Sequence, residues 1–69
     1  MKIKVNGKET QITTQNKNIS LSETLNFLGY KKNTIVVELN NLIINSDKWN
    51  KKIILDGDKL EIVSIVGGG

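Results

Sequence analysis

The chain has 69 residues, enough for one small domain, and its formal net charge of +3 arises from ten basic and seven acidic side chains. It contains neither Cys nor His, which excludes a disulfide framework, a thiol nucleophile, a Cys/His zinc site and an imidazole base. All basic residues are dispersed lysines and none is Arg, so the composition favours a solvated lysine surface over a nucleic-acid interface.

The first predicted elements are two strands joined by a tight turn. Residues 1–6 alternate between apolar and polar side chains, which is typical of a strand with one buried face. Asn6-Gly7 favours a two-residue hairpin because both residues tolerate positive φ. Residues 8–13 return as a second strand whose only large aliphatic side chain is Ile12, so we expect this strand at the edge of the sheet.

One helix is expected over residues 20–29. Ser20 fits the N-cap position, and Glu23 three residues later completes a capping box. Gly29 suits the position just after the helix, where φ is positive. Three leucines share one helical face, namely Leu21, Leu25 and Leu28. We expect this leucine stripe to cover the sheet face formed by Ile3, Val5, Leu60 and Ile62.

Two further strands and a short helical turn are predicted after the helix. Residues 35–39 and 42–44 form the strands, and in the first of them Ile35, Val37 and Leu39 share one face. Asn40-Asn41 turns the chain between the strands because Asn tolerates the left-handed region. Residues 46–49 are typical of a single helical turn. Trp49 is expected to plug the core or its rim and not to stack on a ligand.

The last strand, residues 59–66, follows a tight turn at residues 56–58. Its side chains are apolar on both faces, which indicates a central place in the sheet, parallel to the first strand. Because one helix covers one face, Val63 and Ile65 would lie on the open face and dock a partner. The alternative is that loops or the Trp49 segment cover them.

The order β-β-α-β-β-β predicts an α+β domain over residues 1–66. We expect a mixed sheet of about five strands with one main helix on one face. This is the β-grasp arrangement of ubiquitin-like proteins, although other α+β topologies share the order.

Three glycines, residues 67–69, are expected to form a flexible tail. The scattered carboxylates offer no metal site and little side-chain catalysis, so any chemistry is expected at the C-terminus. A backbone without Cβ atoms and with a free carboxylate can thread a narrow channel in another protein. Three extended residues span at most about 10–11 Å, which is enough to reach a neighbouring active site. The alternative is a frayed end without function.

The sequence resembles the ThiS family, the sulfur carriers of thiamin biosynthesis, over nearly its whole length. The resemblance rests on the hairpin of residues 3–8, the helix of residues 20–29 and the stretch of residues 49–69. In that stretch Trp precedes an Asp-Gly-Asp turn, and the final strand ends in Val-Gly-Gly-Gly. The chain departs from the family pattern at Asn40-Asn41, where Asn-Gly is usual, and at Asn45-Ser46, where Pro-Arg is frequent.

The resemblance implies a carrier protein that is not an enzyme and needs no cofactor or metal. A ThiF-like enzyme with ATP would adenylate Gly69, a persulfide-type donor would convert it to a thiocarboxylate, and thiazole synthase would receive the sulfur. Residues expected to bind these partners are Val63, Ile65, Val66, Gly67 and Gly68.

The sequence also predicts the localisation and the oligomeric state of the free chain. No apolar run approaches the ~18 residues that span a membrane, and no apolar signal core is present, so neither a membrane nor a nucleic acid is an expected partner. We expect a monomer when free, in the cytoplasm, or in an organellar stroma if the chain is plastid-encoded.

Three alternative functions share parts of this pattern. A MoaD-type sulfur carrier of molybdopterin synthesis has the same fold and end, but relatives of that type are usually longer, with an aromatic-proline stretch that this Pro-free chain lacks. A ubiquitin-like modifier would be joined to target lysines through Gly69. An RNA-binding β-grasp module is disfavoured by the dispersed lysines and the lack of aromatic residues on the sheet.

Overall fold

The computed structural model describes residues 1–13 and 18–65. Its helices and strands are, in chain order, β1 (Lys2–Val5), β2 (Lys8–Gln11), β3 (Ile19–Ser20), α1 (Leu21–Phe27), η1 (Lys32–Thr34), β4 (Ile35–Leu39), β5 (Leu42–Ile43), η2 (Ser46–Lys48), β6 (Ile53–Ile54) and β7 (Lys59–Ser64). The two η elements are single 3₁₀ turns.

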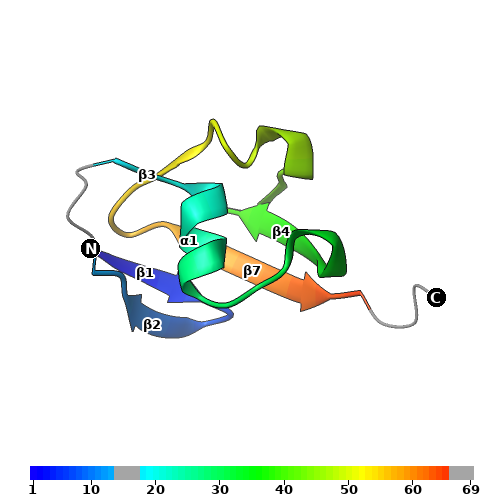
Figure 1. The fold of residues 1–69 in the computed structure, drawn as a ribbon. Helices are drawn as coiled ribbons and strands as arrows, with labels where there is room; N and C mark the ends of the chain where they lie inside the picture. Colours follow the sequence, from blue (N-terminus) through cyan, green and yellow to red (C-terminus); the bar gives the residue numbers. More distant parts are fainter. Residues whose placement is uncertain (14–17, 66–69) are drawn as a thin grey trace.

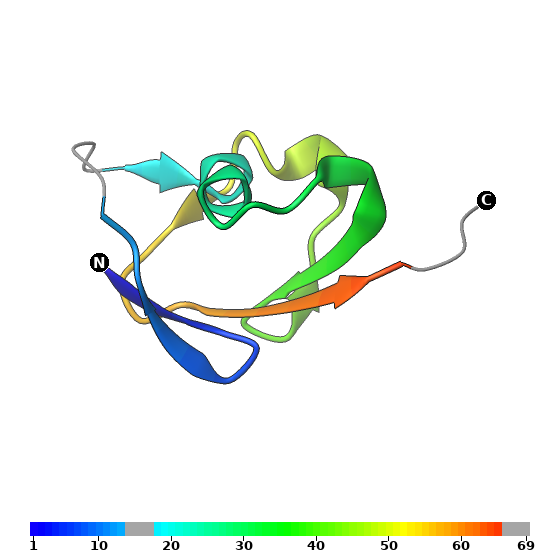
Figure 2. The same cartoon turned by 60° about the horizontal axis from the view of Figure 1, so that its bottom comes forward.

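Five strands form one mixed sheet in the order β2-β1-β7-β4-β5 (Figure 1). The central strand β7 runs parallel to β1 and antiparallel to β4, while the two hairpins β1-β2 and β4-β5 are antiparallel. Figure 2 shows α1 end-on, lying on one side of this sheet. The predicted five-stranded mixed sheet with one covering helix is confirmed, as are the edge position of β2 and the central position of β7.

The helix begins and ends as its sequence predicts. The Ser20 Oγ accepts the Glu23 backbone N–H at 3.0 Å, and the Glu23 Oε1 accepts the Ser20 N–H at 3.1 Å, so both halves of the capping box are formed. Thr24 Oγ1 donates to the Ser20 carbonyl at 2.9 Å. Gly29 follows the helix with a φ of +88°, a conformation that side chains with a Cβ rarely adopt.

The core lies between α1 and the sheet. Leu21 and Leu25 are buried and Leu28 is partly buried, which confirms the predicted leucine stripe. Trp49 is 4% exposed, and its indole N–H donates to the Ile44 carbonyl at 2.9 Å, so the prediction of a core plug is confirmed. The buried apolar residues are Ile3, Ile12, Ile19, Leu21, Leu25, Ile35, Val37, Leu39, Trp49, Ile54, Leu60 and Ile62.

A second, two-stranded sheet, formed by β3 and β6, was not predicted from the sequence. Ile19 pairs with Ile54, and both side chains are buried. Strands of two residues are too short to show a hydrophobic period, and β3 and β6 are far apart in the chain. The 3₁₀ turn η1 was also missed, since its three residues are polar and exposed.

Several predicted strand ends were too long. The strand β2 ends at Gln11 and not at residue 13, although Ile12 still donates its N–H to the Met1 carbonyl at 2.8 Å. The strand β5 ends at Ile43, and β7 ends at Ser64. The predicted domain boundary at Val66 lies outside the described residues.

Candidate functional site

The candidate site begins where the central strand β7 leads toward the C-terminus. Ile65, the last described residue, donates its N–H to the Thr34 carbonyl at 2.7 Å. Thr34 is fixed in turn, because its hydroxyl donates to the Lys31 carbonyl at 2.8 Å. The tail therefore starts from an anchored point beside η1. The remaining predicted site residues lie outside the described residues, namely Val66, Gly67, Gly68 and Gly69.

Of the residues predicted to bind partners, Val63 and Ile65 are described, and Val63 lies on the sheet face away from α1. In β7, Leu60 and Ile62 are buried under the helix, whereas Val63 is 60% exposed. Ile65, just beyond the strand, is 52% exposed. Neither side chain is buried by the loops or by the Trp49 segment, although Ile65 lines a shallow hollow together with Ser46 and Trp49.

Two apolar side chains that the sequence analysis did not assign to the site extend this surface. Val36 in β4 lies directly opposite Val63 and is 38% exposed. Ile43 in β5 lies opposite Glu38 and is 66% exposed. We call these residues the open-face apolar patch, which consists of Val36, Ile43, Val63 and Ile65. The alternation in residues 35–39 already placed Val36 on this side, but only the strand register brings it next to Val63.

Asn6 holds the two parallel central strands together beside this patch. Its backbone has a φ of +52°, as its turn position predicts. Its side chain continues the ladder beyond β1, because Oδ1 accepts the Ile62 N–H at 2.7 Å and Nδ2 donates to the Ile62 carbonyl at 3.2 Å. The sequence indicated the turn but not these contacts, which fix β7 one residue before Val63.

The carboxylates of the Asp-Gly-Asp turn bind neighbouring backbone and side-chain groups. Asp56 accepts the Lys2 backbone N–H at 2.7 Å, and Asp58 accepts the Leu55 N–H at 2.8 Å. Asp58 also accepts from the side chain of Asn40 at 3.0 Å. These carboxylates are engaged in joining the turn to β1 and to the β4-β5 turn, so they position the start of β7.

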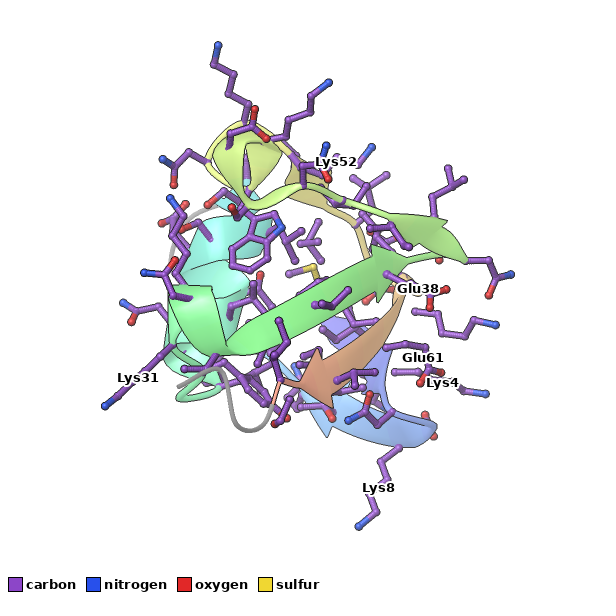
Figure 3. All side chains as sticks on the ribbon, turned by 90° about the vertical axis from the view of Figure 1, so that its right-hand side faces the viewer. Lys4, Lys8, Lys31, Glu38, Lys52 and Glu61 are labelled. Atoms are coloured by element: carbon purple, nitrogen blue, oxygen red, sulfur yellow. The ribbon has the colours of Figure 1, made fainter. Side chains whose placement is uncertain are left out.

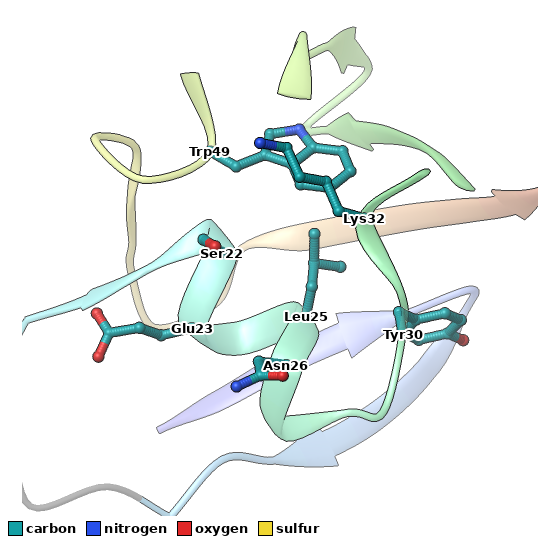
Figure 4. Close-up of a pocket in the computed structure, with 7 residues that line it drawn as sticks. All are labelled: Ser22, Glu23, Leu25, Asn26, Tyr30, Lys32 and Trp49. Atoms are coloured by element: carbon teal, nitrogen blue, oxygen red, sulfur yellow. The ribbon is translucent and has the colours of Figure 1, made fainter. Parts of the chain in front are cut away.

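A shallow hollow of about 190 Å³ lies between α1 and the Trp49 segment (Figure 4). Its volume is below the range typical of small-molecule sites, ~300–1,000 Å³. The hollow is lined by Ser22, Glu23, Leu25, Asn26, Tyr30, Lys32 and Trp49. Among residues 1–13 and 18–65, no group of His, Cys, Asp and Glu could hold a metal ion, and no helix is long and apolar enough to cross a membrane.

Comparison with known proteins gives one consistent result. The model of the ThiS family matches residues 3–69. The uncharacterized protein ycf40 of Trieres chinensis is 42% identical over 65 residues, which cover 94% of this chain and 85% of that protein. A thiazole synthase of Paramagnetospirillum magneticum is 33% identical over 69 residues, which cover 100% of this chain and 20% of that enzyme.

The solved structures agree with the sequence comparisons. The crystal structure of the thiamine biosynthesis protein ThiS from Geobacter metallireducens superposes with a TM-score of 0.82 at 27% sequence identity, and both chains are covered completely. This likeness confirms the β-grasp fold predicted from the order of the elements.

Proposed function

Because this chain belongs to the ThiS family, the sulfur carriers of thiamin biosynthesis, we propose that its Gly69 carboxylate is the group that carries the sulfur. The observation that carries the proposal is that the family match extends through the terminal glycines to residue 69. The anchored end of β7 supports it, since a tail that begins at a fixed point can be aimed by docking the domain.

The chemistry consists of two group transfers. First, an oxygen of the Gly69 carboxylate forms a bond to the α-phosphorus of ATP in a ThiF-like enzyme, pyrophosphate leaves, and an acyl adenylate results. Second, the terminal sulfur of a donor persulfide forms a bond to the Gly69 carbonyl carbon, and AMP leaves. A partner thiol then cleaves the sulfur–sulfur bond and is oxidised to a disulfide, which leaves a thiocarboxylate. The chain has no Cys or His that could attack the activated carbonyl.

Thiazole synthase is the acceptor in this proposal. A thiazole synthase contains a stretch that is 33% identical to all 69 residues of this chain. Carrier and acceptor sequences therefore occur within one polypeptide in that organism. A thiocarboxylate delivered by the tail suits an acceptor enzyme because the sulfur arrives tethered and at high local concentration.

The test is an intact-mass measurement after incubation with ATP, a ThiF-like enzyme and a persulfide donor. We expect one oxygen of the chain to be exchanged for one sulfur. An unchanged mass in the presence of active enzyme and donor would contradict the carrier role. Attachment of the chain to lysines of other proteins would instead identify a ubiquitin-like modifier.

The proposed partner-binding residues follow the end of β7 along the sequence. Val63 and Ile65 would dock the partner through the open-face apolar patch, and Val66, Gly67 and Gly68 would follow it into the active site. Exposed apolar side chains beside a reactive terminus are typical of a docking surface.

We expect Ile65→Asp to weaken binding to the ThiF-like enzyme by at least ~10-fold, since a desolvated carboxylate would face apolar groups of the partner. Stability should change little because Ile65 is 52% exposed. The matched control is Leu55→Asp, since Leu55 is 63% exposed but lies before β7, at the opposite end from the tail. Calorimetric titration and urea unfolding measure the two effects. If Ile65→Asp unfolds the chain, Ile65 is a core residue and the docking role is wrong.

A further inference from the structure

The side chain of Asn6 continues the pairing of β7 beyond the end of β1. Just past β1, the Asn6 backbone N–H donates to the Leu60 carbonyl at 2.8 Å. The next partner of β7 is a side chain, because the Asn6 amide binds both the N–H and the carbonyl of Ile62, at 2.7 and 3.2 Å. In Figure 3, Lys4 on β1 and Glu61 on β7 lie near each other just before this contact. We call the two hydrogen bonds to Ile62 the Asn6 clamp.

The clamp is the partner that the sheet leaves for Ile62. In an antiparallel pair of strands only every second residue bonds to the neighbouring strand. The Asn40 N–H donates to the Lys59 carbonyl at 2.8 Å. The Ile65 N–H donates to the Thr34 carbonyl at 2.7 Å. The odd-numbered residues from 59 to 65 therefore bond on the β4 side, and the peptide groups of Ile62 point toward β1, which has already ended. Because Ile62 is 7% exposed, the clamp satisfies buried groups that would otherwise lack a partner.

Asn6 is also the first residue of the only Asn-Gly pair in the chain. An asparagine side chain can be attacked at Cγ by the backbone nitrogen of the next residue, and a following glycine gives the least hindrance because it has no Cβ. Asn6 and Gly7 are both exposed, so water and hydroxide reach the turn. The sequence therefore provides the reactants of deamidation, whereas the clamp holds the Asn6 amide against β7.

From these contacts we propose that Asn6-Gly7 is a deamidation site that the clamp keeps unreactive in the folded chain. In the reaction, the Gly7 nitrogen loses its proton to hydroxide and forms a bond to Asn6 Cγ. The bond from Cγ to Nδ2 breaks, and this nitrogen takes a proton from water and leaves as ammonia. Water then opens the resulting succinimide and yields aspartate or isoaspartate at position 6. Cγ cannot turn toward Gly7 while Oδ1 and Nδ2 are both bound to Ile62, so the clamp must open first.

Either product loses the clamp permanently. Aspartate keeps an acceptor for the Ile62 N–H, but a carboxylate oxygen replaces the donor Nδ2 and faces the Ile62 carbonyl with no proton between them. Isoaspartate adds a backbone atom to a two-residue turn, whose geometry sets the register of β1 with β2. Deamidation therefore weakens the junction between the first hairpin and β7, the strand that leads to the tail.

The test compares the folded chain with the chain unfolded in guanidinium chloride at the same mildly alkaline pH. Peptide mass spectrometry detects the reaction as a gain of about 1 Da at residue 6. We expect the folded chain to react at least ~10-fold more slowly, because the reaction waits for local opening. Amide hydrogen exchange of Ile62 measures the same opening, since the Ile62 N–H is bound to Asn6 Oδ1. The suppression of deamidation and the protection of the Ile62 amide should agree within ~3-fold.

The kinetic results decide whether the clamp controls the reaction. A suppression that matches the protection of the Ile62 amide supports the proposal. Equal rates in the folded and unfolded chains overturn it. A suppression that differs from the Ile62 protection by more than ~3-fold also overturns it, because the clamp would then not be the gate. The absence of reaction in guanidinium chloride would remove the site itself.

Asn6→Asp and Asn45→Asp test the consequence of the reaction with the same change of charge. Asn6→Asp removes the donor to the Ile62 carbonyl and should lower the guanidinium midpoint of the free chain. Asn45 is exposed and its side chain makes no cap hydrogen bond to η2, so Asn45→Asp should not lower the midpoint. A parent-like midpoint for Asn6→Asp, or an equal loss in both variants, overturns the role of the clamp. The free chain is sufficient for each measurement, so the outcome is independent of the function proposed above.

Discussion

Deletion of Gly69 is expected to abolish thiocarboxylate formation and to leave the stability of the domain unchanged. The deletion shortens the tail by one residue, which is about 3.3–3.6 Å of extended chain. An acyl transfer requires the reacting atoms to approach to about 3–3.5 Å, so a carboxylate withdrawn by this length cannot attack the α-phosphate. The intact-mass measurement detects the loss directly, and urea unfolding checks the stability.

Two substitutions separate the effect of tail length from the effect of side-chain bulk. Gly68→Val keeps the length and the terminal carboxylate but adds a branched side chain, which should block a channel that admits only backbone. Gly69→Ala adds a single Cβ and should give an intermediate rate. The alternative of a frayed end predicts that all three variants are converted at the parent rate. Normal conversion of both the shortened chain and Gly68→Val would therefore remove the carrier function.

Local signals in the sequence were sufficient to predict most of the helices, strands and turns. The Asn6-Gly7 turn, the capping box at Ser20 and Glu23, and the alternation of residues 35–39 all depend on side chains within a few positions of one another. The structure confirms each of them. The central position of β7 was also predicted, from apolar side chains on both of its faces, although the structure leaves Val63 on the open face exposed.

The parts that could not be predicted depend on contacts between distant segments. The β3-β6 pair joins Ile19 to Ile54, and two-residue strands carry no periodic signal. The register between β4 and β7 decides that Val36 meets Val63 and that Glu38 meets Glu61. A shift of one residue would turn one set of side chains to the opposite face, so neither the apolar patch nor the carboxylate pair can be located without the register.

The roles of the turn residues were only partly visible for the same reason. Asn40 was expected to turn the chain because Asn tolerates positive φ, and its φ is +50°. The structure adds that its Oδ1 accepts the Lys59 N–H at 3.0 Å, so the β4-β5 turn is joined to the start of β7. Propensity predicts the backbone of such a residue, whereas the partner of its side chain follows from the assembled sheet.

Leu25→Ala should destabilise the domain by ~2–5 kcal/mol, the range for removing a buried leucine side chain whose site does not collapse. Leu25 is 3% exposed and lies in the middle of the helical stripe that covers the sheet. A small domain has about 5–15 kcal/mol of stability, so this loss is a large share of the total. Urea unfolding measures it. The matched control is Phe27→Ala on the same helix, because Phe27 is 54% exposed and should change stability by less than ~0.5 kcal/mol.

The Leu25→Ala variant also distinguishes the roles of the two faces of β7. Leu25 packs on the helix side, with Leu60 and Ile62 in the same core, while Val63 is exposed on the other side. At temperatures where the Leu25→Ala chain remains folded, its conversion to the thiocarboxylate should therefore match that of the parent, whereas Ile65→Asp should lose conversion while folded. A Leu25→Ala chain with the parent's urea midpoint would contradict the packing of α1 on the sheet. A folded Leu25→Ala chain that is not converted would show that the helix side also contacts the partner.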